Sequence, residues 1–363
     1  MRFLGEKEIK QIALGATLIG AGGGGDPYIG ELMALTAVHR YGKVKLISVN
    51  EIKDKDYFMP VADMGAPSIM TEKFPKGDEF KRAFQTISTY LNRKMAGTFP
   101  MEAGGVNSMM PIVLAAQMGL PIVDCDGMGR AFPELQMTTF YLGGVSVTPM
   151  VVTDEKGNLS LLKTVSSKWA ERLARDLSVE MGGSAPIALF GSTGSQIKEN
   201  GIYGIVSLCQ KIGQLIQNIP KSRGDSLKNL LKITHGYHLF DGKVVDVYRT
   251  TQAGFNFGTI KFSGIGDFSG QTFTVNFQNE NLIAKKNNQV VATVPDLISF
   301  ANYQTLLPST SEAIKYGKRL SILGIPANPK WRTKKGLQTI GPRYFKYDID
   351  YIPIEKLVRK ESL

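Results

Sequence analysis

The segment 123–134, VDCDGMGRAFPE, carries the densest group of side chains suited to chemistry. It places the carboxylates of Asp124, Asp126 and Glu134 and the guanidinium of Arg130 within eleven residues, directly after a predicted strand. Asp124 and Asp126 share one face if the strand continues that far, and two such carboxylates either separate their pKa values or share a cation. Arg130 can neutralise one of them or grip an anionic substrate. The alternative is an ion-paired turn without a substrate.

A second segment, 100–108 (PMEAGGVNS), combines a carboxylate, two glycines and an asparagine. It follows a predicted short strand, so Glu102 and Asn107 are expected at the carboxyl edge of a sheet, where open α/β folds bind ligands. As purely structural features, Gly104 and Gly105 would form a tight turn and Asn107 would cap a helix. Glu102 is harder to explain in that way, because a carboxylate at the end of a sheet needs a partner.

The third segment, 20–27 (GAGGGGDP), is rich in glycine and formally satisfies the dinucleotide-binding pattern G-x-G-x-x-G. That pattern requires a strand before its first glycine, whereas residues 6–18 have helical spacing. Asp26 would also set a carboxylate against a pyrophosphate, and it serves more naturally as a helix N-cap. We therefore favour a backbone-lined part of an active site, with helix-to-helix packing as the alternative.

The histidines and cysteines give weaker signals. His235 and His238 are three residues apart, but no helix is expected there to align them on a metal ion. No G-x-S-x-G nucleophile elbow is present. Cys125 and Cys209 form no CxxC pair, so we interpret them as buried small hydrophobes in a reducing compartment.

The composition indicates a globular protein. With 363 residues, 43% hydrophobic and 21% charged, the chain suits two domains at roughly 100–200 residues each. No apolar stretch approaches the ~20 residues that cross a bilayer, and the N-terminus does not resemble a signal peptide. We expect a cytoplasmic protein that does not associate with membranes.

The chain is basic, and its charge is uneven. The net charge is +11, and residues 311–363 hold 12 Lys+Arg against 5 Asp+Glu, so this end alone carries +7. No zinc-finger spacing, RNP-like aromatic run or basic heptad helix accompanies that charge. We therefore expect no nucleic-acid partner, and we expect the tail to be a folded part of the second domain.

The first domain is predicted to span 1–165 as an α/β unit with a mainly parallel sheet. Predicted helices and strands alternate along it: helices at 6–18, 27–41, 78–95 and 107–118, and strands at 43–49, 97–101 and 121–125. The second domain, 166–363, is predicted to hold two helices, at 167–177 and 196–218, followed by a β-rich core. Residues 237–294 alternate Val, Phe, Ile and Thr between Gly and Asn turns, which indicates antiparallel strands.

Together, the three N-terminal segments resemble the signatures of the DUF917 family, also called S-methyl thiohydantoin desulfurase-like. The strings that carry the resemblance are GGGGDPY at 22–28, PMEAGGVNS at 100–108 and DGMGRAFPE at 126–134. The second half agrees through LFDGKVVD at 239–246, QNENL at 278–282, PDLI at 295–298 and GPR at 341–343. The resemblance covers nearly the whole chain and implies an α/β N-terminal half with a β-rich C-terminal half.

The activity implied by the resemblance is hydrolysis at C2 of a hydantoin-like ring, with release of a thiol where the ring carries sulfur. We expect a catalytic base among Glu102, Asp124 and Asp126, with a divalent cation between them left open. The remaining candidates would contact the substrate, and they are Gly23, Gly24, Gly25, Asp26, Asn107, Arg130 and Glu134. The alternative is a non-catalytic subunit or ligand-binding regulator of a hydantoinase-type enzyme. We expect a small-molecule substrate, and a homo-oligomer or a complex with a hydantoinase-type partner.

Overall fold

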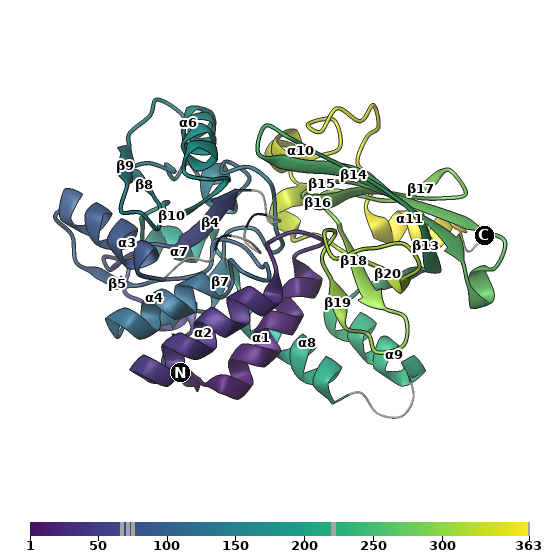
Figure 1. The fold of residues 1–363 in the computed structure, drawn as a ribbon, viewed down its shortest axis with the longest axis horizontal. Coiled ribbons are helices and arrows are strands. Elements are labelled where there is room, and N and C mark those ends of the chain that lie inside the picture. The colour runs from purple at the N-terminus through teal and green to yellow at the C-terminus, as the bar shows by residue number, and fades with distance from the viewer. Residues whose placement is uncertain (66–68, 70–72, 74–76, 219–222, 362–363) are drawn as a thin grey trace.

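The computed structural model shows two lobes side by side, one formed by the first 218 residues and one formed mainly by the C-terminal sheet (Figure 1). It describes residues 1–65, 69, 73, 77–218 and 223–361. In these ranges, no helix is both long enough and apolar enough to cross a membrane.

Two helices flank the glycine-rich segment. The helix α1 (Glu6–Ile19) precedes it and α2 (Pro27–Tyr41) follows, with Asp26 as N-cap and Pro27 in the first turn. The Asp26 Oδ1 accepts from the Tyr28 N–H at 2.9 Å. Both helices were predicted, α2 with its bounds unchanged, because the capping residues are local in the sequence.

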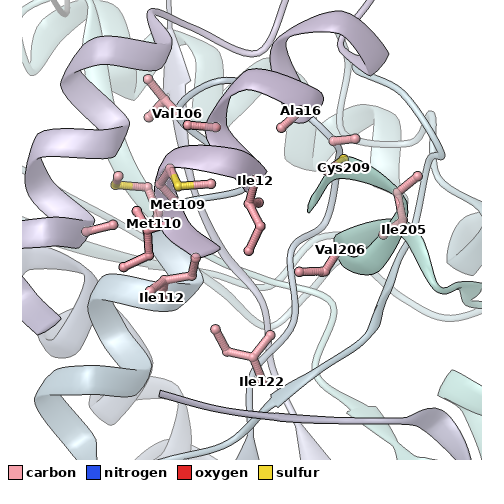
Figure 2. Packing of buried hydrophobic residues seen from close by; sticks show 14 of the residues in the cluster. Ile12, Ala16, Val106, Met109, Met110, Ile112, Ile122, Ile205, Val206 and Cys209 are labelled. Carbon is pink, nitrogen blue, oxygen red and sulfur yellow. The ribbon is translucent and has the colours of Figure 1, made fainter. Parts of the chain in front are cut away.

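Helix α1 packs tightly against α8 (Ile205–Gln217) through glycines. A Cβ on Gly15 would lie 1.8 Å from the Cys209 carbonyl oxygen, and one on Gly213 would lie 1.8 Å from that of Gln11. No larger residue fits either position without moving the two helices apart. Figure 2 shows Ile12 and Ala16 of α1 near Val206 and Cys209 of α8 in this core.

The described residues of the N-terminal lobe form four small sheets. Their strand orders are β1 (Arg2–Leu4), β2 (Val44–Ile47), β6 (Ile122–Val123); β4 (Val61–Gly65), β10 (Ser184–Ala188), β8 (Met150–Thr153), β9 (Leu159–Leu162); β11 (Ser192–Thr193), β3 (Tyr57–Phe58), β5 (Met95–Gly97); and β12 (Ile202–Tyr203), β7 (Cys125–Asp126). The remaining helices here are α3 (Asp78–Tyr90), α4 (Met110–Met118), α5 (Thr139–Leu142), α6 (Ser167–Glu180) and α7 (Gly194–Asn200). The α/β class is as predicted.

The strand directions correct one detail of the prediction. Parallel pairing holds β2 to β6 and β3 to β5, whereas the other strand pairs described in this lobe are antiparallel. The sheet β4-β10-β8-β9 is antiparallel throughout, and β8 and β9 are joined by a short hairpin, which allows no other direction. The alternation of helices and strands along the chain therefore did not predict whether neighbouring strands run parallel or antiparallel.

The lobe continues past residue 165. Strands β10, β11 and β12 pair with β4, β3 and β7, so residues after α6 complete sheets that begin in the first half of the chain. The prediction of one helix over 196–218 is wrong. The chain forms α7, then β12, and α8 begins only after Gly204, whose φ of +73° ends the strand.

The C-terminal lobe is one antiparallel sheet, as predicted. Its order is β17 (Gln289–Thr293), β16 (Glu280–Lys286), β15 (Thr272–Gln278), β14 (Phe255–Gly264), β13 (Tyr237–Gln252), β20 (Arg319–Ile325), β18 (Leu297–Asn302) and β19 (Pro308–Ser309). The helices α9 (Arg223–Thr234), α10 (Lys334–Ile340) and α11 (Ile354–Glu361) accompany it.

The basic tail is folded, as predicted. Strand β20 lies inside the sheet, and the buried carboxylate of Asp296 holds the end of the chain. It accepts from the Ile354 N–H at 2.8 Å, from the Tyr351 hydroxyl at 2.9 Å and from Arg332 at 2.9 Å.

Hydrogen bonds join the two lobes at the glycine-rich loop. The carbonyl of Ala21 accepts from the Asn281 N–H, and that of Gly22 accepts from the Ser311 N–H, both at 2.8 Å. The Ser299 hydroxyl also donates to the Leu18 carbonyl at 2.6 Å. The loop therefore takes its shape from both lobes.

Candidate functional site

A pocket lies where the two lobes meet. Its cavity of about 90 Å³ is lined by the glycine-rich loop, β4, the 101–107 and 128–135 segments, α6 and the turn between β15 and β16. This volume is below the range of about 300–1,000 Å³ typical of drug-sized ligands, so it suits a small molecule. Five of the predicted site residues line it: Gly24, Gly25, Glu102, Asn107 and Glu134.

The glycine-rich loop forms one wall because its backbone is left-handed. Gly24 and Gly25 have φ of +79° and +82°, which only glycine adopts readily. A Cβ on Gly104 would lie 2.5 Å from the Gly24 Cα, and the Val106 N–H donates to the Gly24 carbonyl at 2.7 Å. The glycines of the 20–27 and 100–108 segments therefore allow the two backbones to come into contact. A helix, not a strand, precedes the loop, as the argument against a dinucleotide fingerprint required.

Glu102 is held in the pocket by hydrogen bonds to both carboxyl oxygens. The side-chain amide of Asn107 donates to Oε1 at 2.7 Å, and the Phe132 N–H donates to Oε2 at 3.4 Å. Asn107 is itself fixed, since it accepts from the Asp63 N–H at 2.7 Å and donates to the Asp63 carbonyl at 3.1 Å. The asparagine predicted as a helix cap therefore orients the carboxyl group of Glu102.

Burial controls the acidity of Glu102. Loss of solvent raises the pKa of this carboxyl to about 7, although the bonds from Asn107 and Phe132 and the charge of Arg130 oppose the shift. A carboxyl with this pKa exchanges a proton near neutral pH, which suits a general base.

Glu280 is the second acid of the pocket, and sequence reasoning did not assign it a role. It begins β16 and is 3% exposed, and its carboxyl group packs on Gly23, where a Cβ would lie 1.9 Å from Oε1. Within the described part of the chain, its Oε2 is buried without a hydrogen-bond partner. Burial, and next the nearby Glu102, raise the pKa of Glu280 well above its usual range, against the charge of Arg130. The only signal in the sequence was its place in the string at 278–282.

Asp63 and Arg175 also line the pocket without having been predicted. Burial raises the pKa of Asp63 to about 7, although Ser184 donates to this carboxyl and Lys73 lies near it. Arg175 forms a buried ion pair with Glu171 at 2.7 Å. Asp63 lies within β4 and Arg175 on α6, so neither stood beside a glycine motif that would have singled it out.

Asp124 and Asp126 do not form the pair that was predicted. Asp124 Oδ1 accepts from the Ser207 N–H at 3.1 Å, so it caps the first turn of α8. Asp126 is fully buried, and both of its oxygens accept from the Gly129 N–H at 2.9 Å. Neither residue is among those lining the pocket.

Arg130 donates to four backbone carbonyls. Its guanidinium donates to those of Ala131 at 3.0 Å, Pro295 at 3.1 Å, Asp296 at 3.0 Å and Asn281 at 3.1 Å. Burial lowers its pKa to about 10, against the charges of Glu280, Asp296 and Glu102. Arg130 therefore connects the 126–134 segment to the C-terminal lobe, and it is not among the residues that line the pocket.

The other predicted residues lie around the pocket. Glu134 lines it and accepts from the Tyr344 hydroxyl at 2.7 Å, Gly23 packs behind it on Glu280, and Asp26 caps α2. Among the residues that the structure describes, no three His, Cys, Asp or Glu side chains are grouped to hold a metal ion. The set Glu102, Asp124 and Asp126 does not fit a divalent cation, because their oxygens accept from separate N–H groups.

The fold and the site define a two-domain α/β protein whose pocket needs both domains. The chain belongs to the S-Me-THD-like family, DUF917: the N-terminal domain of that family matches residues 7–164 and the C-terminal domain matches 165–354. The resemblance inferred from the motifs is confirmed.

A crystal structure of a protein from Chromobacterium violaceum has the same fold. The two chains are 24% identical, with a TM-score of 0.83 over 98% of this chain and 100% of that one. At this identity the likeness concerns the fold alone. No curated protein matches the chain.

Proposed function

We propose that the protein is a hydrolase that acts at C2 of a hydantoin-like ring and releases a thiol from a ring that carries sulfur. One observation carries the proposal: Glu102 and Glu280, one from each family domain, face the same small pocket, and burial raises the pKa of both. Two carboxyls with pKa values raised to different extents can serve as base and acid at neutral pH.

Glu102 would be the base. Its pKa of about 7 leaves a substantial ionised fraction at neutral pH, and Asn107 fixes its orientation. It accepts a proton from a water molecule as the water oxygen bonds to C2 and the electrons of the C2–N double bond move onto the ring nitrogen. The Gly24–Gly25 backbone wall, with Asn107 behind it, would position the polar edge of the ring.

Glu280 would be the acid. Burial raises its pKa well above the ordinary range, which favours the protonated form, and in the proposal it donates this proton to sulfur as the C2–S bond breaks and the C2–N double bond re-forms. The ring then tautomerises to a C2 carbonyl, and the proton on Glu102 passes back to Glu280. The balance is one water consumed and one thiol released.

In this proposal Asp126, Arg130 and Asp124 act at a distance from the ring. Asp126 and Arg130 hold the 126–134 segment, which contributes Phe132 and Glu134 to the pocket wall. Asp124 anchors the start of α8. They are positioning residues, and no step is assigned to a metal ion.

The test is a turnover screen on hydantoins, thiohydantoins and their S-methyl forms, with released thiol measured by a colorimetric reagent. Glu102→Gln should lower kcat by roughly two or more orders of magnitude, in line with the contribution of about 10²–10⁴-fold usual for a general base. Glu180→Gln, the same charge change on the exposed end of α6, should leave turnover unchanged. Binding of these rings without turnover would instead favour the alternative, a non-catalytic subunit or regulator.

The setting of the protein is also a proposal. Cys125 and Cys209 are free and buried, which supports the reducing cytoplasm as its compartment. We further propose a homo-oligomer or a complex with a hydantoinase-type partner, with no nucleic acid or membrane as partner. Size-exclusion chromatography with light scattering, alone and with such an enzyme, tests the assembly.

A further inference from the structure

The outer face of α6 carries apolar side chains that are exposed to solvent. Trp169 and Leu173 are 49% and 41% exposed and lie one helical turn apart, so they share a face. Val179 is 50% exposed near the end of the helix, and Val165, just before its start, is 91% exposed. Figure 1 shows α6 at the top of the N-terminal lobe. Neighbouring exposed apolar residues mark protein–protein contacts, in which tryptophan is enriched.

The exposed charges of α6 are divided between its two halves. Lys168 and Arg172 lie in the first half, Asp176 and Glu180 lie in the second, and all four are exposed. A helix dipole favours acidic side chains near the N-terminus and basic ones near the C-terminus, so this order opposes the dipole. A basic residue four positions before an acidic one is also the weaker order for a pair within a helix. The arrangement therefore does not serve the stability of α6 itself.

An antiparallel second copy of α6 would match this division of charge. A twofold axis places a surface against itself, and an axis near Ala174 passes through the middle of the helix. Arg172 then lies at the height of Asp176 of the second copy, and Lys168 lies at the height of its Glu180. Each basic half faces an acidic half, and the exposed apolar side chains of the two helices meet between them.

We propose that the protein is a homodimer in which α6 packs antiparallel against α6 of a second copy. The inference gives the proposed homo-oligomer a surface and an occupant, and it does not depend on the reaction. The inner side of the same helix serves the pocket, because Arg175 lines it and Glu171 accepts from the Leu135 N–H at 2.8 Å. The dimer uses the outer side, so each copy keeps a complete pocket.

The test reverses one charge in each half of the helix. Light scattering should give the wild-type chain a mass of about twice 39.7 kDa. Arg172→Glu places an acid opposite Asp176 of the second copy at two symmetric positions, so it should weaken association at least roughly tenfold in analytical ultracentrifugation. Asp176→Arg should do the same by placing two bases together. Arg40→Glu, the same reversal at an exposed position of α2, should leave association unchanged.

Recombining the two reversals tests the pairing itself. The double variant Arg172→Glu, Asp176→Arg should regain the affinity of the wild type, because each acid again faces a base. An equimolar mixture of the two single variants should form a heterodimer for the same reason, after circular dichroism has shown that both are folded. Single variants that associate as tightly as the wild type, or that stay apart when mixed, would overturn the inference.

Trp169 reports the contact directly. The chain has two tryptophans, and Trp331 is only 1% exposed. Acrylamide should therefore quench tryptophan fluorescence weakly in the dimer and more strongly in Asp176→Arg, which leaves the Arg172 guanidinium over the Trp169 ring. Equal quenching of the dimer and this variant would place the contact elsewhere and overturn the inference.

The outcomes distinguish this inference from the proposed function. A dimer that follows the pairing rules, without turnover of any sulfur-bearing ring, would contradict the hydrolase and leave the dimer standing. Turnover by a chain that stays monomeric would do the reverse. A chain that is monomeric alone and associates only with a hydantoinase-type enzyme would overturn the dimer in favour of that partner.

Discussion

The 126–134 segment and the Glu102–Glu280 pocket both contain buried charged side chains, but these side chains differ in their hydrogen-bond partners. In the segment, both Asp126 oxygens accept from one N–H group and Arg130 donates to four carbonyls. In the pocket, Glu280 keeps a buried oxygen without a partner among the described residues, and Glu102 has a pKa of about 7. The segment has the higher density of charge in the sequence, yet the pocket has the polar groups left for a ligand.

The comparison shows that a cluster of charged residues does not by itself mark a site. Arg130 lies in the segment with the densest group of charged side chains, and its role there is to attach that segment to the C-terminal lobe. A catalytic group must instead be able to change its protonation state or its partner, and Glu102 and Glu280 meet that requirement through burial.

The largest effect on stability is expected from the removal of Arg130, which tests the structural role of the 126–134 segment. Arg130→Met keeps most of the side-chain length but leaves backbone carbonyls of both lobes without their donor. We expect a loss of about 3–5 kcal/mol in the free energy of unfolding. Urea denaturation measures it, with exposed Arg40→Met as a control that should change stability little. A loss below about 1 kcal/mol would show that Arg130 does not hold the two lobes together.

The pH dependence of turnover tests whether the two pocket carboxyls titrate during catalysis. Turnover should rise with pH through about 7 as Glu102 loses its proton, and it should fall at higher pH as Glu280 loses its own. The limb near 7 should disappear together with most of the activity in Glu102→Gln. A profile that is flat between about pH 5 and 9 would exclude Glu102 as the base.

Stability should also depend on pH through Glu102. Its folded pKa of about 7 lies above the ordinary 4.5, so the folded state binds more protons than the unfolded state between these values. Stability is therefore expected to fall by about 1–3 kcal/mol as the pH rises from 4.5 to 7, and then to level off. Urea denaturation at a series of pH values tests this. Glu102→Gln should flatten part of the curve, and an unchanged curve would show that Glu102 does not titrate as described.

The smallest expected effect belongs to Asp126→Asn. Burial raises the pKa of Asp126 well above its usual range, which favours the uncharged carboxyl, and asparagine replaces it at nearly equal volume. We expect a loss of about 1 kcal/mol, comparable to one hydrogen bond, and turnover within a few-fold of wild type. Activity lowered by two orders of magnitude in a stable variant would return Asp126 to the catalytic group.

Local signals in the sequence predicted well what is decided locally. Asp26 and Pro27 start α2, Gly42 follows its end, and the turns of residues 237–294 give an antiparallel sheet. The helix expected over 196–218 failed because β12 pairs with β7, a partner far away in the chain.

The site was predicted in part for the same reason. Glu102 and Asn107 lie beside a glycine turn that contacts the Gly24 loop. Both residues belong to one short segment, so the sequence alone indicated that they lie close together. Glu280 comes from the other lobe, and nothing near it in the chain reports the Gly23 surface on which it packs. Arg130 donates to the C-terminal lobe through carbonyls at 281, 295 and 296, and because every residue has a carbonyl group, no sequence pattern could reveal these bonds.

The contact between Gly23 and Glu280 has a consequence for biosynthesis. The glycine-rich loop lies near the N-terminus, so it leaves the ribosome long before the strand that completes its pocket, and N-terminal domains tend to fold first during synthesis. The nascent chain therefore carries no assembled site until the C-terminal sheet has been made and docked. A split of the gene between α8 and α9, where the N-terminal lobe ends, should yield two fragments that are inactive alone, and activity should return only when they associate.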